Sequence, residues 1–438
     1  MMRATQTSRA LVAACVGNLL EWYDFTVYAL FAAYIADSFF PSNDPNVALV
    51  KTFLTFGAGF GARPLGALLI GAYGDRAGRK AALTLTIWIM AAGTLVIAAA
   101  PGYAVIGALA PWLLLIGRLL QGFSAGGEIG TASAFLAESA AAGARGGMAA
   151  WQEASMGMSN ILGALVAFTL SSLLSQAQLQ SWGWRIPFIV GLLIAPAGLM
   201  LRRSLHETTD FESDLARRRQ TAVARSPLRL AFGAYGGALA VGFGLSILWA
   251  VAVYVLNIYT PVYVQRAFGF SAQQAFAASL IGNVLFVIGC LAAGRLSDRV
   301  GRRAMLAAGA CALLLGVLPL YHWLQVMPTT AVLIVVQSAF CVMVASFVGV
   351  APAALSDLFP TSMRATGISI VYNAAFVVFG GLALPILTWF TRQAHGSAMA
   401  PAGYVICAAL VGLLTLPFFE RQRAAAAEIG ASAAGAAA

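Results

Sequence analysis

The sequence is poor in charged residues. Only 10% of its 438 residues are charged, whereas 60% are hydrophobic, and the mean hydropathy is +0.83. Soluble domains carry about 25% charged residues. A chain with so few charges lacks the polar side chains to cover a water-exposed surface, so we predict that it lies in a lipid bilayer.

Cysteine and histidine are scarce too, with five and three residues. The histidines stand far apart and show no metal-ligand spacing. The sequence also lacks an HExxH pair, a nucleophile with a nearby base and a G-x-x-x-x-G-K-[ST] phosphate loop. We therefore expect no metal, no cofactor, no enzymatic activity and no ATP-driven pump. All five cysteines lie in apolar stretches, where we expect them to be small core residues: Cys15, Cys290, Cys311, Cys341 and Cys407.

Long apolar segments take up most of the chain. A helix crosses the hydrocarbon core in about 20 residues, and a spanning segment must satisfy its own backbone hydrogen bonds, which predicts α-helices. Short alternating segments, typical of membrane β-barrels, are absent from the sequence. The twelve predicted spans lie near 10–36, 49–72, 81–100, 108–134, 146–174, 185–201, 231–259, 271–293, 304–324, 329–354, 367–391 and 401–419.

One charged stretch occurs twice between these spans. The first copy, GAYGDRAGRK, runs from Gly71 to Lys80, and the second, GRLSDRVGRR, from Gly294 to Arg303. Each copy is predicted to be a short hairpin between two membrane helices. Two copies at corresponding places indicate a duplicated helical bundle, as in many secondary transporters. The charged residues expected to act as gating loops are Asp75, Arg76, Arg79, Asp298, Arg299 and Arg302.

The duplication divides the chain into two halves. We predict a six-helix bundle over 1–201, a cytoplasmic linker over 202–230, a second six-helix bundle over 231–419 and an Ala-rich cytoplasmic tail over 420–438, expected to be disordered. The net charge of +10 comes mostly from arginines on one side of this topology. By the positive-inside rule both termini are cytoplasmic. The basic charge thus orients the chain and does not indicate nucleic-acid binding.

Two carboxylates interrupt the first span. Glu21, Asp24 and Tyr28 share one helical face, and ionisable groups inside a membrane usually face an internal cavity and serve function. Glu128, in the fourth span, is a further candidate. The three carboxylates are either proton carriers or partners of structural ion pairs, and both interpretations stay open.

Two arginines lie inside predicted spans. Arg63 is in the second span, and Arg118 shares a helical face with Gln121 in the fourth. A guanidinium fork suits a carboxylate, whether it belongs to a ligand or to a side chain. Gln152, Asn257 and Asn373 are further candidates for substrate binding. The aromatic residues of the seventh and eleventh spans are expected to be interface anchors instead: Trp249, Tyr254, Tyr259 and Tyr372.

Several stretches together resemble the metabolite–proton symporter family of the major facilitator superfamily. They are GNLLEWYDFTVY, ARPLGALLIGAYGDRAGRK, GRLLQGFSAGGEIG, WGWRIPF, LRRSLHET and LFPTSMRATGISIVYN. The resemblance implies an all-α membrane protein of twelve helices in two pseudo-symmetric halves. It also implies alternating access and proton-coupled uptake across a bacterial inner membrane. The run FFPSND after the first span is most similar to the carboxylate-transporting members.

The expected function is therefore symport of protons with a small organic anion, a di- or tricarboxylate such as citrate or α-ketoglutarate, by a monomer. The substrate, protons and surrounding lipid are the expected partners. The alternatives are a symporter for proline or glycine betaine and, less favoured, a transport-inactive ligand sensor. Osmolyte carriers of this family are expected to have a long C-terminal coiled coil, whereas here the tail after Phe419 is short and lacks heptads.

Overall fold

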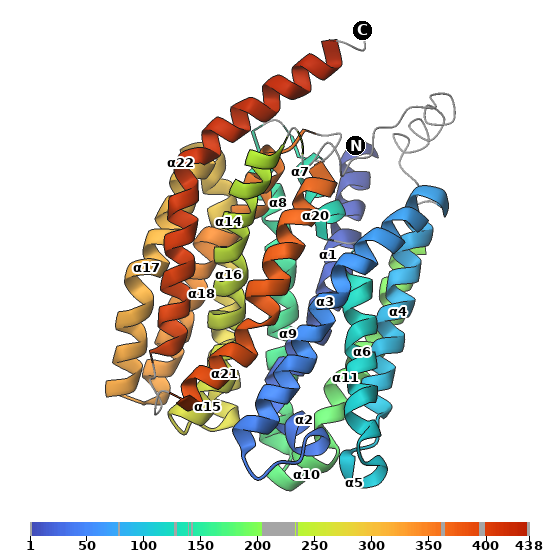
Figure 1. Cartoon of the computed structure of the whole chain (residues 1–438), viewed down its shortest axis with the longest axis vertical. Helices are drawn as coiled ribbons and strands as arrows, with labels where there is room; N and C mark the ends of the chain where they lie inside the picture. Colours follow the sequence, from blue (N-terminus) through green and yellow to red (C-terminus); the bar gives the residue numbers. More distant parts are fainter. Residues whose placement is uncertain are drawn as a thin grey trace.

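The structure, a computed structural model, is a bundle of long helices (Figure 1). It describes residues 2–77, 79–126, 129–138, 140–141, 143–203, 233, 235–360, 364–393 and 399–435, and these ranges contain no strand. The predicted linker lies almost entirely outside them. Both chain ends lie at the same end of the bundle in Figure 1. We call this the terminal end.

The N-terminal half contains six spans, three of which are broken into two helices. Short elements connect the spans at the end opposite the terminal end: α5 (Tyr103–Ile106), α10 (Gln176–Ser181) and the 3₁₀ turn η1 (Gly183–Arg185). The spans themselves are α1 (Met2–Leu30) with α2 (Ala32–Phe39), α3 (Pro45–Ala77), α4 (Arg79–Ala99), α6 (Leu109–Ala125) with α7 (Ile129–Glu138), α8 (Arg145–Ala149) with α9 (Trp151–Leu173), and α11 (Ile186–Arg203).

The C-terminal half repeats this order. Two of its spans contain a wide π-helical stretch, η2 (Val253–Tyr259) and η4 (Phe376–Gly381), a feature often found at functional sites. The remaining elements are α14 (Gly236–Ala252), α15 (Thr260–Ala267), α16 (Ala272–Val300), α17 (Arg302–Val326), α18 (Thr330–Val348), α19 (Ala351–Asp357), α20 (Arg364–Ala375), α21 (Ala383–Gln393) and α22 (Ala400–Gly435).

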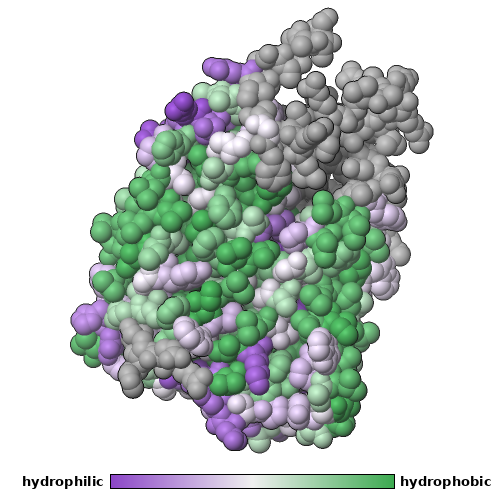
Figure 2. All heavy atoms as spheres, in the orientation of Figure 1, coloured by the Kyte–Doolittle hydropathy of each residue, from purple (hydrophilic) through white to green (hydrophobic). Residues whose placement is uncertain are grey.

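The sides of the bundle are apolar. Eight described helices are long and apolar enough to cross a membrane, and three shorter apolar helices accompany them. Figure 2 shows hydrophobic residues over much of the bundle's flank, with hydrophilic residues gathered toward its two ends. The prediction of an all-α membrane protein is confirmed.

The repeated charged stretch lies at the same junction of each half. Its first copy falls where α3 gives way to α4, and its second where α16 gives way to α17. Gly301 makes the second turn with φ +100°, a backbone angle that favours glycine. The predicted hairpin is therefore confirmed for the second copy. In the first copy Gly78 and the side chains of Asp75, Arg76 and Arg79 lie outside the described residues.

The two halves meet along two seams. On one, α9 packs against α16, and on the other α3 packs against η4 and α21. A Cβ at Gly57 would lie 2.6 Å from the Gly381 carbonyl oxygen, so α3 and η4 approach almost backbone to backbone. At the terminal end α7 packs against α20.

Two smaller predictions are wrong. The Ala-rich tail continues α22 as helix to Gly435, projecting from the bundle in Figure 1, because alanine has the highest helix propensity. Cys311 and Cys407 are exposed on outer helices, where a thiol faces the apolar surface at little cost, whereas Cys290 and Cys341 are buried as expected.

Candidate functional site

Two buried arginines lie side by side in the N-terminal half. Arg63 on α3 is 1% exposed and Arg118 on α6 is 0% exposed. Glycines on both helices bring the backbones together, and a Cβ at Gly59 would lie 2.8 Å from the Arg118 carbonyl oxygen. The close contact of α3 and α6 therefore presents two guanidinium groups from neighbouring helices.

Aromatic rings surround both guanidinium groups. The Arg63 Cζ lies 4.4 Å from the Phe60 ring centroid, and the Arg118 Cζ lies 4.4 Å from that of Tyr28. Phe25 lies against both, at 5.1 Å from Arg63 and 4.6 Å from Arg118. Such contacts stabilise a desolvated cation by about 2 kcal/mol, which helps to hold two like charges in an apolar interior.

The two carboxylates of α1 pair with different partners. Glu21 Oε1 accepts a hydrogen bond from Arg63 Nη2 at 3.4 Å. Asp24 points instead into the N-terminal half, toward α4, α6 and α11, where Thr94 donates its hydroxyl hydrogen to Asp24 Oδ2. The pair that the sequence places on one face therefore divides between two environments.

Gln121 connects Asp24 to Arg118. Its Nε2 donates to Asp24 Oδ2 at 3.1 Å, and its Oε1 accepts from Arg118 Nη1 at 2.6 Å. A group that draws the guanidinium away from Gln121 would also disturb the amide that stabilises the Asp24 carboxylate. This relay of two hydrogen bonds links the contacts of the Arg118 guanidinium to the environment of the Asp24 carboxylate.

Several buried polar atoms near the boundary of the halves lack a hydrogen-bond partner among the described residues. Buried polar groups in native proteins are nearly always paired, so each such atom calls for a reason. Several donors point to an acceptor-rich ligand. The arginine donors are Arg63 Nε and Arg118 Nε and Nη2, and the other atoms are Tyr254 OH, Asn257 Nδ2, Gln337 Oε1 and Asn373 Oδ1.

The C-terminal half contributes aromatic rings to this region. Tyr254, on η2, lies 5.4 Å from the Phe60 ring and 6.3 Å from the Trp22 ring, between centroids. Trp249 packs against Tyr372 at 5.1 Å. The prediction that these aromatic residues are interface anchors is wrong: Trp249, Tyr254, Tyr259 and Tyr372 are each no more than 3% exposed, because they face the other half and not the lipid surface.

Polar contacts also cross between the halves. The Trp249 indole N–H donates to Glu153 Oε2 on α9 at 3.2 Å. Asn160 Nδ2 donates to Asn283 Oδ1 at 3.1 Å, and Asn373 Nδ2 donates to the Gly126 carbonyl at 3.4 Å. These three contacts must break if the halves separate.

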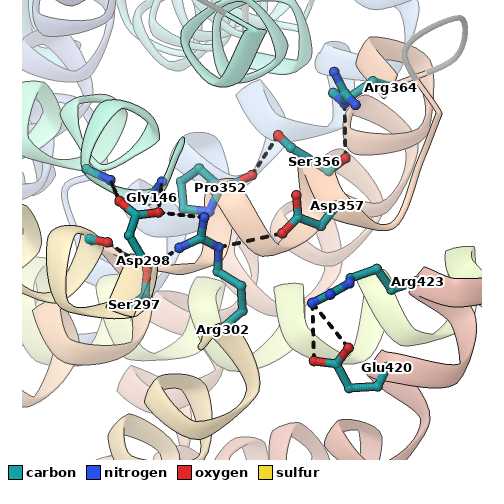
Figure 3. A network of polar contacts seen from close by, with 12 residues as sticks. Gly146, Ser297, Asp298, Arg302, Pro352, Ser356, Asp357, Arg364, Glu420 and Arg423 are labelled. Atoms are coloured by element: carbon teal, nitrogen blue, oxygen red, sulfur yellow. Dashed lines mark hydrogen bonds and ion pairs between the residues drawn. The ribbon is translucent and has the colours of Figure 1, made fainter. Parts of the chain in front are cut away.

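An ionic cluster joins the halves at the terminal end (Figure 3). Asp298 accepts hydrogen bonds from the backbone N–H groups of Gly146 and Gly147, at 2.8 and 2.9 Å, and from Arg302 at 2.8 Å. Arg302 Nε also lies 3.6 Å from Asp357 Oδ2. We call Gly146, Gly147, Asp298, Arg302 and Asp357 the terminal latch. Arg299 is exposed on the same turn of α16.

A family model described as "Sugar (and other) transporter" matches residues 10–224 and 212–421. The chain belongs to the major facilitator superfamily. Its fold is similar to that of the superfamily's proton:xylose symporter XylE bound to 6-bromo-6-deoxy-D-glucose, with a TM-score of 0.77, 18% identity and 96% of each chain covered. A partially occluded inward-open structure of XylE from E. coli gives a TM-score of 0.74, at 17% identity over 95% of this chain and 98% of that one.

Curated relatives place the protein among the metabolite–proton symporters of this superfamily. A citrate-proton symporter of Salmonella typhi is 37% identical, over 93% of this chain and 92% of the relative. An alpha-ketoglutarate permease of Escherichia coli is 33% identical over 94% of each chain. A proline/betaine transporter of the same species is 34% identical over 93% of this chain but 82% of the relative. The protein is thus a proton-coupled transporter of the major facilitator superfamily and not an enzyme.

The described candidates for proton coupling and substrate binding divide into four groups. Asp24, Gln121 and Arg118 form one connected set, and Glu21 pairs with Arg63. Asn257 and Asn373 lie buried on the C-terminal side. Gln152 exchanges hydrogen bonds with Asn18 on α1, within its own half. Glu128 lies outside the described residues.

Sequence reasoning missed two features of the site: the contact of Thr94 with Asp24, and the contact between Glu153 and Trp249. Threonine is common in membrane helices, where its hydroxyl often bonds its own backbone, as Thr94 also does with the Met90 carbonyl. Glu153 lies at the start of a predicted span, where a carboxylate needs no special explanation. A buried glutamate opposite a tryptophan of the other half was recognisable only from the packing of α9 against that half.

Proposed function

We propose that this transporter imports a small organic anion, a di- or tricarboxylate, together with protons across a bacterial inner membrane. The observation that carries the proposal is the pair of buried arginines, whose unpaired N–H groups lie near the boundary of the halves. The citrate and alpha-ketoglutarate carriers among the relatives support the same substrate class. We propose that the protein acts as a monomer.

Charge arithmetic explains why such a substrate needs protons. Moving an anion into a negative interior costs about 2.3 kcal/mol per charge per 100 mV. Each co-transported proton cancels one of those charges, and the proton gradient supplies the driving force. Asp24 is the proposed proton carrier, since it is buried and connected to Arg118 through Gln121.

In the proposed cycle, the carboxylates of the substrate take up the free N–H groups of Arg63 and Arg118. The planar guanidinium fork matches a carboxylate and gives short, charge-assisted hydrogen bonds. An anion at Arg118 offsets the positive charge that reaches Asp24 through Gln121, so the Asp24 carboxylate becomes less stable and its protonation is favoured. The anion and the proton then bind together, as symport requires.

The halves would then rock about the bound substrate. We place the terminal end in the cytoplasm, because arginines are abundant there and the opposite end has few basic residues, such as Arg185 and Arg266. The terminal latch, formed in this structure, would close the cytoplasmic side and open to release the substrate. Asp75, Arg76 and Arg79 of the first copy are proposed to act in the same way.

The second candidate is symport of proline or glycine betaine, which the proline/betaine relatives favour. A quaternary ammonium is usually held by aromatic faces. Here Phe25, Tyr28 and Phe60 already lie against arginine guanidinium groups, so a further cation would be repelled.

The test is uptake into proteoliposomes under an inward proton gradient, with labelled citrate, α-ketoglutarate, succinate and proline. We expect accumulation of at least one carboxylate, abolished by a protonophore. Accumulation of proline alone would overturn the anion assignment and make the arginines structural. Binding without accumulation in sealed vesicles would instead support a ligand sensor.

A further inference from the structure

A pocket lies inside the N-terminal half, beside Asp24 and Glu21. Residues of α1, α4, α6 and α11 line it, and none of the described lining residues comes from the C-terminal half. Its polar wall consists of Asp24, Glu21, Thr86, Thr94 and Ser124. The substrate path of the proposed function runs between the halves, whereas this pocket is lined from within the N-terminal half and meets the Arg63 pair only through Glu21.

The pocket extends from Asp24 toward the terminal end. Since α1 starts at that end, Gly17 on the pocket wall lies nearer to it than Asp24 by seven residues, about 10 Å of helix. Thr86 precedes Thr94 by two turns on α4, which also starts there. On α6 and α11, which run the other way, Ser124 and Ala195 lie beyond Gln121 and Gly191 in the same direction.

The wall suits water and protons better than an organic solute. Carboxylate and hydroxyl side chains from three helices lie among small residues such as Ala91 and Ala195 and larger apolar ones such as Leu20 and Met90. The Ser124 hydroxyl donates to the Thr86 carbonyl at 2.7 Å, so two of these polar side chains lie on adjacent walls. A roomy site with several polar partners is what a bound water requires.

We propose that this pocket is the route by which the proton leaves Asp24 for the terminal end. The proposal rests on the proposed proton coupling, to which it adds a path separate from that of the substrate. In the proton step, the O–H bond of the neutral Asp24 carboxyl breaks, and its proton passes to a water molecule in the pocket. The products are the Asp24 carboxylate and a hydronium ion.

The groups facing Asp24 fit this step. Arg118 on α6 and its Gln121 relay would stabilise the carboxylate once the substrate has left. Glu21 and Tyr23 are the ionisable neighbours on α1, and Glu21 is engaged by Arg63. The lining residues from α4 and α11 include no ionisable group. The released proton therefore meets no fixed cation on the pocket wall.

Blocking the pocket should separate net transport from exchange. Net uptake requires the proton to leave Asp24 at the terminal end, whereas exchange of internal for external substrate proceeds with the carrier loaded and protonated throughout. Ala91→Leu and Ala195→Leu each place a larger side chain in the pocket. The matched control is Ala92→Leu, since Ala92 is the next residue of α4, is exposed and does not line the pocket.

The experiment measures both activities in proteoliposomes with labelled α-ketoglutarate, or with proline if the unmodified protein accumulates proline instead. We expect Ala91→Leu and Ala195→Leu to lower proton-driven uptake about tenfold or more. The exchange rate should stay within about twofold of that of the unmodified protein. Retained exchange also shows that the variants are folded. Ala92→Leu, and Ala91→Ser with its small hydroxyl, should retain both activities.

Equal loss of uptake and exchange in the two leucine variants would overturn the proposal, because the pocket would then serve the substrate or the fold. Unchanged uptake in both would overturn it as well. The comparison of uptake with exchange is made with whichever substrate the unmodified protein accumulates. A wrong substrate assignment would therefore show in the unmodified protein, whereas failure of the proton route would show only in the leucine variants.

Discussion

Among the described residues, the N-terminal half buries five charged side chains, whereas the C-terminal half buries only uncharged polar groups to the same degree. The N-terminal set consists of Glu21, Asp24, Arg63, Arg118 and Glu153. The corresponding interior of the other half holds amides, hydroxyls and aromatic rings, among them Trp249, Tyr254, Asn257, Asn283, Gln337 and Asn373. Both halves nevertheless share one helix order and one repeated charged stretch.

This difference indicates that both halves kept the same helix arrangement after duplication, whereas buried charged groups are concentrated in the N-terminal half. Charges inside a membrane are costly and persist where function requires them. Concentrating them in one half leaves the other free to shape the substrate site with neutral groups. We therefore expect changes in the N-terminal half to affect coupling and the binding and selection of anions, and changes in the C-terminal half to affect mainly the transport rate.

The largest effect should follow from Asp24→Asn. The amide cannot carry a proton, so proton-driven accumulation should fall about 100-fold or more, while exchange is retained. The measurement is uptake against exchange in proteoliposomes. Asp37→Asn, at an exposed position on α2, is the control and should resemble the unmodified protein. Full accumulation by Asp24→Asn would remove Asp24 from the mechanism.

Arg118→Lys tests whether the anion binds to the arginines of the N-terminal half. Lysine keeps the charge but lacks the planar fork that bonds Gln121 and a carboxylate together. We expect KM for the transported carboxylate to rise about 10- to 100-fold, the equivalent of one charged hydrogen bond. Concentration-dependent initial rates test this, with Arg423→Lys on the exposed part of α22 as the control. An unchanged KM would contradict a direct role.

Arg302→Ala tests whether the terminal latch holds the halves together. Loss of the guanidinium leaves Asp298 and Asp357 without their cation, so states open at the terminal end should gain population about tenfold. Spin labels at Ala144 and Arg303, both exposed, would report wider distance distributions. Arg299→Ala, on the same turn of α16, should leave the distances unchanged. Equal widening in both variants would assign the effect to general loss of charge.

The smallest effect is expected for Trp249→Phe, the C-terminal side of the Glu153 contact. Phenylalanine keeps the packing against Tyr372 but removes the indole N–H. We expect the transport rate to change about two- to fivefold, as for one hydrogen bond of about 1 kcal/mol. Glu153→Gln keeps an acceptor for the indole and should stay near the unmodified rate. If Glu153→Gln instead abolished uphill uptake, Glu153 would join Asp24 as a proton carrier.

Much of the fold was predictable from the sequence, because a lipid solvent leaves few choices. The apolar runs predicted the spans, and the repeated GRLSDRVGRR-type stretch predicted the duplication. The site was predictable only in part. Spacing on α1 correctly indicated buried carboxylates, but the rotation of α1 against α3 and α4 decides that Glu21 meets Arg63 while Asp24 meets Thr94. Tertiary packing also buries Trp249 and Tyr254. The general preference of aromatic residues for the membrane interface does not predict this.

The close contact of α3 and α6 has a consequence for selectivity. Neither Gly59 nor Gly122 leaves room for a side chain against the neighbouring backbone, so the two helices cannot slide or part without losing their packing. The spacing between the main chains at Arg63 and Arg118 is therefore fixed, so both guanidinium groups start from fixed points. If a dicarboxylate contacts both arginines, as proposed, selectivity among homologous dicarboxylates would follow the number of carbons between their carboxylates.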